Sequence, residues 1–303
     1  MNILLATHQL NQVGGTERFT ADMAHALHRK GHAVTVFSFV DGWSAQQMRA
    51  EGLEVTHVRP LDTPDAIWLN HHTCLAAFTH DPCPVIHTSH GPWHSLEFPI
   101  PGADAYVGVS QEIADTYPQR AMTVIGNGVD LTRFQPTPLP GDGTVLSLCK
   151  NRAAGALVAE ACQRQGRPFQ GVYYEEAPVW DVAPLIAQAD IVVGSGRSAL
   201  EGLALNRPTL VFDVRGKDRG PRADGWLTPE TIDAYRYANC STRTGDHQWL
   251  VEDLEKALYI PPDGTWGRAW VEEHANLSRQ VDAYLALTEQ IYERSNEETA
   301  QVA

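Results

Sequence analysis

Short apolar runs alternate with amphipathic stretches along almost the whole chain. Residues 3–7 are apolar and few, as expected of a buried parallel strand, and residues 17–30 carry apolar side chains at helical spacing. Gly31 stands where the glycine after a helix C-cap belongs, and a second apolar run follows at residues 33–40. The first 40 residues therefore predict one β-α-β unit.

The same alternation continues on both sides of residues 135–143 (QPTPLPGDG), which have the proline and glycine content of a linker. Repeated β-α-β order predicts an α/β fold with two Rossmann-like, doubly wound domains, each a parallel sheet covered by helices. The further predicted strands are 53–58, 66–69, 85–88, 105–109, 122–125, 145–149, 171–174, 191–193 and 209–212, and the helices of the second series are 153–165, 182–188 and 198–205.

These elements place the domain boundaries. We assign residues 1–136 to an N-terminal Rossmann-like domain, 137–143 to the linker and 144–270 to a C-terminal Rossmann-like domain. Residues 271–303 are expected to form a helix that packs back toward the N-terminal domain and a polar tail. Ligands of open α/β sheets bind at the carboxyl ends of the strands, so the two domains are expected to face a cleft there.

Composition and charge limit the partners. The 303 residues include 23 Lys and Arg against 37 Asp and Glu, a formal net charge of −14, which disfavours nucleic acid and anionic membranes. No apolar run is long enough to span a bilayer, and the first residues lack the basic segment of a secretion signal. The five cysteines are scattered without a CxxC pair, which predicts a reduced, cytoplasmic protein.

Residues 14–17 (GGTE) lie between the first predicted strand and helix. Paired glycines permit close backbone approach of a ligand, and a helix N-terminus presents N–H groups to an anion. Taken alone, these residues favour the alternative, a tight turn with Thr16 as the N-cap. The motif lacks the third glycine of a dinucleotide fingerprint and the lysine of a Walker motif.

Six of the 13 histidines lie between His71 and His94. His87, His90 and His94 have the spacing of one helical face, but Pro92 interrupts any helix there, and no carboxylate or thiol completes a zinc set. We therefore predict no metal site. His90 follows an apolar strand and is expected to reach the cleft as a hydrogen-bond donor or proton carrier, although a turn histidine bonded to backbone fits the spacing equally.

Two segments of the second series suit a phosphorylated ligand. Lys150 and Arg152 follow a predicted strand, where two cations can hold a diphosphate; a solvated loop is the alternative. Residues 189–208 (ADIVVGSGRSALEGLALNRP) predict a strand, a turn and a helix from about Ser198, whose N–H groups suit phosphate. Glu201 can accept hydrogen bonds from a ribose diol, or serve as the capping-box partner of Ser198.

Together these segments resemble the GT-B glycosyltransferases, in particular the retaining enzymes of glycosyltransferase family 4. The resemblance covers most of the chain, and its closest match is residues 125–134 (IGNGVDLTRF). The other segments that carry it are the GGTE motif, residues 24–36 (AHALHRKGHAVTV), residues 85–91 (VIHTSHG), Val109-Ser110 and residues 194–202 (GSGRSALEG).

The resemblance implies the roles of individual residues. His90 matches the catalytic-site histidine, Lys150 takes the place of a diphosphate-binding arginine and Arg152 that of a lysine. Glu201 matches the ribose-binding second glutamate of a paired-glutamate motif whose first glutamate is replaced by Val193. Ser195 or Arg197 is expected near the position of the missing glutamate. The implied donor-binding set is Gly15, Ser195, Gly196, Arg197, Ser198, Ala199, Leu200 and Glu201.

The implied activity is transfer of a sugar from a UDP- or GDP-type sugar to a hydroxyl of a small-molecule, glycan or lipid-linked acceptor. Retention is expected, with no cofactor or metal because fixed cations hold the diphosphate. A nucleotide-sugar 2-epimerase and a non-catalytic sugar-nucleotide binding protein are the alternatives. Residues 215–226 are expected to form either a lid or acceptor contact, or a solvated loop.

Overall fold

The computed structural model describes residues 1–78, 80–173, 176–214, 220–245 and 247–302. The described chain forms two compact units, residues 1–128 with 277–303, and residues 129–276. We call them the first and the second unit. Within the described ranges, no helix is both long enough and apolar enough to cross a membrane.

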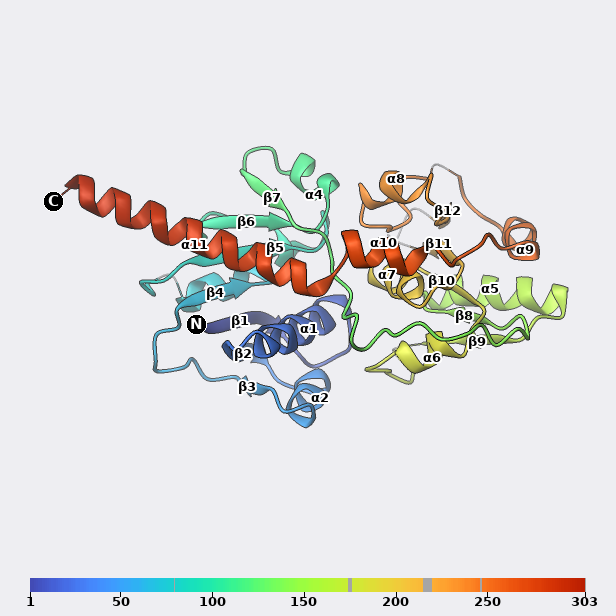
Figure 1. Cartoon of the computed structure of the whole chain (residues 1–303), viewed down its shortest axis with the longest axis horizontal. Coiled ribbons are helices and arrows are strands. Elements are labelled where there is room, and N and C mark those ends of the chain that lie inside the picture. Colours follow the sequence, from blue (N-terminus) through green and yellow to red (C-terminus); the bar gives the residue numbers. More distant parts are fainter. Residues whose placement is uncertain (79, 174–175, 215–219, 246, 303) are drawn as a thin grey trace. The chain divides into compact units, whose positions relative to one another are not determined.

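The first unit contains a seven-stranded parallel sheet of order β3-β2-β1-β4-β5-β6-β7 (Figure 1). Its strands are β1 (Asn2–Gln9), β2 (Ala33–Val40), β3 (Glu54–Thr56), β4 (Ala66–Leu69), β5 (Val85–Ser89), β6 (Ala105–Gly108) and β7 (Met122–Val124). Its helices are α1 (Gly15–Arg29), α2 (Trp43–Ala50), α3 (Leu75–Phe78), α4 (Gln111–Thr116) and α11 (Leu277–Val302), with 3-10 turns η1 (His72–Cys74) and η2 (Ser95–Glu97). The predicted glycine after α1, Gly31, has φ +83°.

The C-terminal helix α11 belongs to the first unit, as the sequence predicts. Tyr284 is 1% exposed and its hydroxyl lies 2.9 Å from Thr88 Oγ1 on β5. Trp68 on β4 donates to Thr288 Oγ1 at 3.1 Å. The last six residues before α11 lie in the second unit, so the C-terminal segment is divided at Asn276/Leu277.

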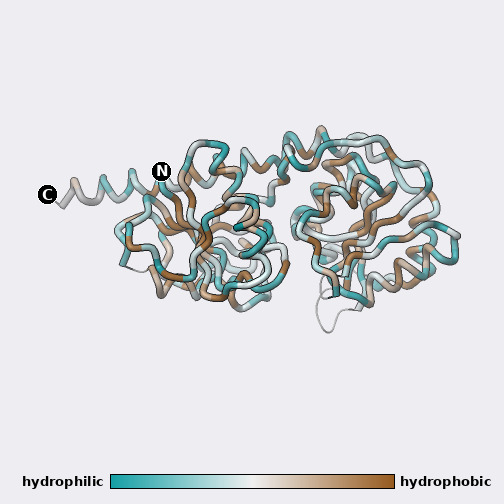
Figure 2. Tube along the Cα trace, turned by 90° about the horizontal axis from the view of Figure 1, so that it is seen from below, coloured by the Kyte–Doolittle hydropathy of each residue, from teal (hydrophilic) through white to brown (hydrophobic). Residues whose placement is uncertain are grey.

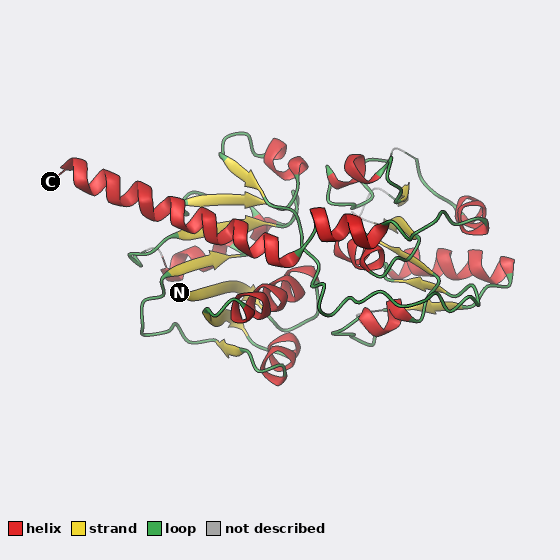
Figure 3. Ribbon diagram, viewed as in Figure 1, coloured by secondary structure: helices red, strands yellow, loops and turns green. Residues whose placement is uncertain are grey.

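The second unit contains a five-stranded sheet of order β12-β11-β10-β8-β9, in which only the pair β11–β12 is antiparallel. Its strands are β8 (Val145–Ser147), β9 (Phe169–Gly171), β10 (Ile191–Gly194), β11 (Thr209–Val214) and β12 (Pro221–Trp226). Its helices are α5 (Arg152–Gln165), α6 (Ala183–Ala187), α7 (Arg197–Ala204), α8 (Ile232–Arg236), α9 (Val251–Tyr259) and α10 (Gly267–His274). Helices flank the strands in both units, and apolar residues gather inside each (Figures 2 and 3).

The segment predicted as a lid or solvated loop is different in the structure. Residues 221–226 form the edge strand β12, which pairs with β11. Residues 215–219 lie outside the described residues, as does Tyr174 at the end of a predicted strand.

The predicted linker is fixed to the second unit, and the division falls earlier, at Gly128/Val129. The fully buried Arg207 donates to Thr137 O at 2.8 Å and to Pro138 O at 3.3 Å. The carboxylate of Asp190 accepts from the amides at positions 141 and 143 at 2.8 and 2.6 Å. Proline and glycine therefore mark irregular but hydrogen-bonded backbone here.

Gly128, in the segment that most resembles family 4, lies where the chain leaves the first unit. A Cβ at Gly128 would lie 2.5 Å from Leu277 Cα, so only glycine fits. Its amide donates to Gln280 Oε1 at 2.9 Å, and Gln280 Nε2 donates to Gly126 O at 2.9 Å. The glycines therefore tie the exit of the chain to the start of α11.

Replacing Arg207 with leucine tests this anchoring. The change removes the fully buried guanidinium that donates to the carbonyls of residues 137, 138, 186 and 187, so we expect the free energy of unfolding to fall by about 3 kcal/mol. Arg164→Leu, which removes exposed ion pairs with Glu160, Glu252 and Glu255, should cost less than about 1 kcal/mol. Equal losses in urea unfolding would contradict the anchoring role.

Candidate functional site

The carboxyl ends of β8, β10 and β11 meet at one edge of the second unit's sheet. The side chain that connects them is Asp213 on β11, which is fully buried. Its carboxylate accepts from the amides of Lys150 and Asn151 at 3.2 and 3.3 Å and from Ser195 Oγ at 3.2 Å. Sequence reasoning missed Asp213, although a lone carboxylate in the apolar run TLVFDV was a signal.

The loop after β8 turns its backbone amides inward. Besides the two amides bound by Asp213, the amide of Ala153 donates to Asn151 Oδ1 at 2.8 Å and caps α5. Arg152 is 76% exposed in its side chain, pairs with Glu176 and lies 6.0 Å from the ring of Tyr173. This loop can therefore offer a diphosphate its side chains but not these amides.

The turn after β10 is built differently. Gly196, at φ +63° and ψ −126°, is the N-cap of α7, with no side-chain cap bond, and its own amide donates to Cys240 O at 2.7 Å. The helix begins at Arg197, so the capping box of Ser198 with Glu201 was a wrong prediction. An α-helix presents its first N–H groups toward its N-terminus, and α7 begins at Arg197.

The other predicted donor-binding positions of α7 are parts of the core. Ala199 and Leu200 are 0% and 4% exposed, and their amides donate to Gly196 O at 3.2 and 3.5 Å. Val193 is also fully buried.

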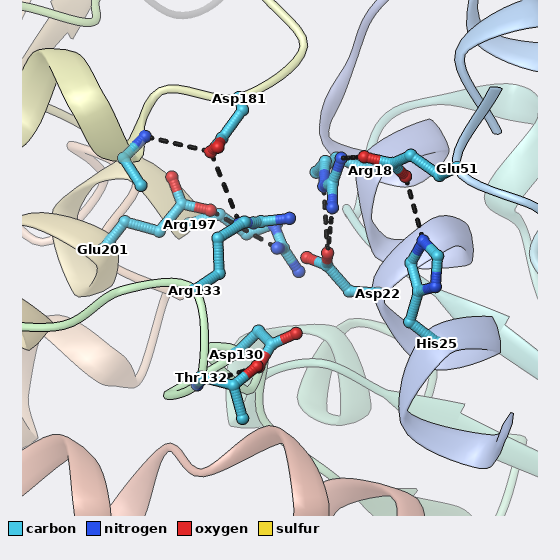
Figure 4. Close-up of polar contacts among 11 residues, drawn as sticks. Arg18, Asp22, His25, Glu51, Asp130, Thr132, Arg133, Asp181, Arg197 and Glu201 are labelled. Atoms are coloured by element: carbon cyan, nitrogen blue, oxygen red, sulfur yellow. Dashed lines mark hydrogen bonds and ion pairs between the residues drawn. The ribbon is translucent and has the colours of Figure 1, made fainter. Parts of the chain in front are cut away.

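Arg197 and Glu201 form a buried pair one helical turn apart. Their side chains are 10% and 6% exposed, and Arg197 Nη2 lies 3.3 Å from Glu201 Oε1 (Figure 4). A second cation in this unit, Arg133, lies 3.5 Å from Asp181 and 4.6 Å from the ring of Phe134. The second unit therefore combines a helix N-terminus with cations and a nearly buried carboxylate, which is a chemistry suited to a nucleoside diphosphate.

In the first unit, His90 follows β5 and belongs to a hydrogen-bond chain. Its Nε2 lies 2.8 Å from Asn70 Oδ1, Asn70 Nδ2 donates to Thr20 Oγ1 at 2.9 Å, and Thr20 Oγ1 donates to Thr16 O at 2.8 Å. Because the carbonyl of Thr16 only accepts, the order of donors assigns the proton of neutral His90 to Nε2. Nδ1 is then the basic nitrogen of the ring.

The GGTE motif forms the start of α1. The N-cap is Gly14, which corrects the expectation of Thr16, and Gly15 is the first helical residue. A Cβ at Gly14 would lie 2.3 Å from Glu17 Oε2, so the carboxylate of the nearly buried Glu17 lies directly over Gly14. Gly15 belongs to the first unit, whereas the other seven predicted donor-binding residues belong to the second.

Further along α1, a charged network links the helix to the end of α2. Arg18 Nη2 lies 2.8 Å from the fully buried Asp22, and Arg18 Nη1 lies 3.5 Å from Glu51 (Figure 4). Glu51 Oε2 lies 2.9 Å from His25 Nε2. Sequence reasoning did not single out these residues, because the carboxylate of Glu51 comes from a separate helix end.

One group of three side chains in the described ranges, His71, His94 and Glu97, has possible metal-ligand atoms within 4.8 Å of one another. His71 Nδ1 accepts from the amide of His8 at 2.9 Å and lies 2.9 Å from Thr7 Oγ1. An amide can only donate, so the proton of neutral His71 is on Nε2 and neither nitrogen offers a metal a lone pair. The group does not fit a metal; it offers an N–H donor near a carboxylate.

Burial keeps two histidines of the first unit neutral. The pKa of His71 is lowered to about 4, chiefly by burial and then by the charges of His94, His8 and His72. The pKa of His87 on β5 is lowered to about 3, again chiefly by burial, followed by the charges of His72 and His71. Both rings therefore act as neutral groups at pH 7.

Comparison with solved structures places this geometry in a known fold. An Anabaena protein, Alr3699/HepE, in complex with UDP is similar over 96% of this chain and 100% of its own, with a TM-score of 0.61 and 15% identity. A putative UDP-N-acetylglucosamine 2-epimerase from Listeria monocytogenes is similar over 97% of both chains (TM-score 0.59, 13% identity). An α-glucosyltransferase in complex with UDP and DNA is similar over 95% of this chain and 99% of its own (TM-score 0.58, 9% identity).

These likenesses establish the predicted fold class, a GT-B arrangement of two α/β units. No protein-family model matches the sequence, and no curated protein sequence matches it.

The buried histidines predict a pH dependence of stability. Between pH 6.5 and the folded pKa near 3, the unfolded chain binds a proton at His87 that the folded chain does not, so stability falls as the pH falls. For His87→Leu we expect the loss of unfolding free energy from pH 7 to pH 5 to shrink by about 2 kcal/mol. Tyr106→Phe, at a ring beside His87, should keep the wild-type slope. Denaturant unfolding at several pH values measures this, and an unchanged slope in His87→Leu would contradict it.

Proposed function

We propose that the chain is a glycosyltransferase that moves a sugar from a UDP-sugar to an acceptor hydroxyl. The observation that carries this proposal is the start of α7, where an N-terminus without a side-chain cap adjoins the buried Arg197–Glu201 pair. The fold supports it, because Alr3699/HepE, which has this fold, has been solved with UDP and with UDP-glucose.

In this proposal, the second unit binds the donor. The first amides of α7 and the side chain of Lys150 stabilise the negative charge that grows on the departing diphosphate. Glu201 accepts hydrogen bonds from the ribose hydroxyls, with Arg197 holding its carboxylate in place. Arg152 reaches the diphosphate only after leaving Glu176, which its exposed position permits at little cost.

The first unit supplies His90 and the acceptor. Because Asn70 holds the Nε2 proton, Nδ1 of His90 accepts a hydrogen bond from a hydroxyl of the transferred sugar or of the acceptor. The acceptor is a small molecule, a glycan or a lipid-linked sugar; the net charge of −14 disfavours DNA. Retention, membership of family 4 and metal independence follow from the resemblance of the sequence, with fixed cations in place of a metal.

A nucleotide-sugar 2-epimerase is the second candidate. It is favoured by the likeness to UDP-N-acetylglucosamine 2-epimerases, which extends over 96–97% of this chain. It is favoured also by Val193, since a buried valine stands where the resembling transferases hold the donor sugar with a carboxylate.

Binding of nucleotides tests the donor site. We expect UDP to raise the melting temperature more than GDP, ADP or TDP, with a stabilisation of about 2.7 kcal/mol at 100 times its Kd. Glu201→Gln should weaken UDP binding about ten-fold, as loss of charge-assisted hydrogen bonds does. Glu160→Gln removes the carboxylate of an exposed helical pair with Arg164 and serves as the matched control. Absence of any nucleotide shift in the wild type would refute the donor site.

Turnover of UDP-glucose and UDP-N-acetylglucosamine distinguishes the candidate functions. A transferase should release UDP slowly by transfer to water, and His90→Ala should lower that rate about 100-fold if His90 contacts the reacting groups. Proton and phosphorus NMR report both UDP and any new UDP-sugar. An epimer without UDP would favour the epimerase, and tight binding with neither product would favour a binding protein.

A further inference from the structure

The turn that begins α7 is hydrogen-bonded to a second segment of the same unit, whose backbone is strained. The amide of Gly196 donates to the carbonyl of Cys240 at 2.7 Å. Cys240 lies in residues 238–245, which we call the clamp segment. Since Gly196 sets where the helix starts, the position of the Cys240 carbonyl sets the direction of the first amides of α7.

The backbone of the clamp segment is unusual. Asn239, Cys240 and Thr242 have φ of +56°, +48° and +60°, and among the described non-glycine residues the other positive φ is at Asn206. Left-handed backbone is disfavoured for side chains with a Cβ, and for a β-branched threonine it is a clear outlier. Such strained backbone persists only where contacts with the surrounding structure compensate for its energetic cost.

The carboxylate of Asp224, on β12, is the group that holds the clamp segment in this strained conformation. It accepts from the amide of Thr242 with Oδ2 at 2.9 Å and from the amides of Thr244 and Gly245 with Oδ1, both at 2.9 Å. A Cβ at Gly245 would lie 2.1 Å from Ala223 O, so the segment also approaches β12 closely. Three backbone amides of the clamp segment therefore donate to one side chain.

We propose that Asp224 is a positioning residue for the donor nucleotide: it holds the clamp segment in its left-handed conformation, and the carbonyl of Cys240 in turn holds Gly196 and the start of α7. Asp224 acts without touching the nucleotide. Its effect on UDP rests on the proposed function, whereas its effect on the amide of Gly196 does not.

Asp224→Asn tests the clamp. An amide in place of the carboxylate keeps one acceptor oxygen and sets an NH2 group against a backbone N–H, so the strained run is expected to relax. Hydrogen exchange of the Gly196 amide should rise, and the Kd for UDP should rise about ten-fold. Asp263→Asn, at a carboxylate that binds the amide and hydroxyl of Thr265 in the same unit, is the matched control and should change neither.

Relief of strain distinguishes positioning from a merely structural role. Thr242→Gly makes the positive φ inexpensive, so Thr242→Gly combined with Asp224→Asn should recover part of the protection of Gly196 and of the UDP affinity. Should Asp224→Asn not fold, the milder Ser241→Ala, which removes a 2.6 Å bond to Ala238 O, should raise the exchange of Gly196 by a smaller factor.

The outcomes separate the two proposals. Unchanged exchange of Gly196 in Asp224→Asn, or in Ser241→Ala if that variant is needed, overturns the clamp whatever UDP does. No recovery in the double variant overturns the role of strain. Faster exchange of Gly196 together with absence of UDP binding in the wild type supports the clamp and refutes the donor-site proposal.

Discussion

The carboxylate of Asp213 is the constraint on which the edge of the second sheet depends. A fully buried charge requires hydrogen-bond partners, and Asp213 takes them from the loop after β8 and from Ser195 after β10. Its partners thus fix two loops relative to β11. The amides of Lys150 and Asn151 donate to Asp213, so they are not the groups that would bind an anion here. The groups at this edge that could bind one are the side chain of Lys150 and the start of α7.

Buried charges also fix the irregular backbone that precedes β8. Arg207 and Asp190 bind carbonyls and amides of residues 137–143, where neither a helix nor a sheet satisfies the backbone. The resemblance of this segment to a linker is compositional, and composition does not reveal that two charged side chains of the same unit reach it. The exit from the first unit is made instead by Gly128, against the start of α11.

The sequence predicts what is local. Hydrophobic periodicity is a property of neighbouring residues, so the alternation of strands and helices and the left-handed Gly31 were predictable, and strand ends correctly placed Lys150 and Ser195 at one edge. The side chains that hold this edge were not, because Asp213 binds Lys150 across 63 residues. Likewise, Asn70 binds His90 across 20 residues and Thr20 across 50. Hydrogen bonds between residues this far apart in the sequence leave no periodic pattern from which they could be predicted.

The two units differ in the charge at the helix that starts near their carboxyl edge. In the first unit, the nearly buried Glu17 lies over Gly14 at the start of α1, and Thr16 Oγ1 donates to Glu97 Oε1 at 3.5 Å. In the second, α7 starts without a side-chain cap, and Glu201 is neutralised by Arg197. A phosphate at α1 would meet two carboxylates, whereas a hydroxyl could donate to them. Charge alone therefore disfavours an anionic ligand at the start of α1, whereas the start of α7 carries no such excess of negative charge.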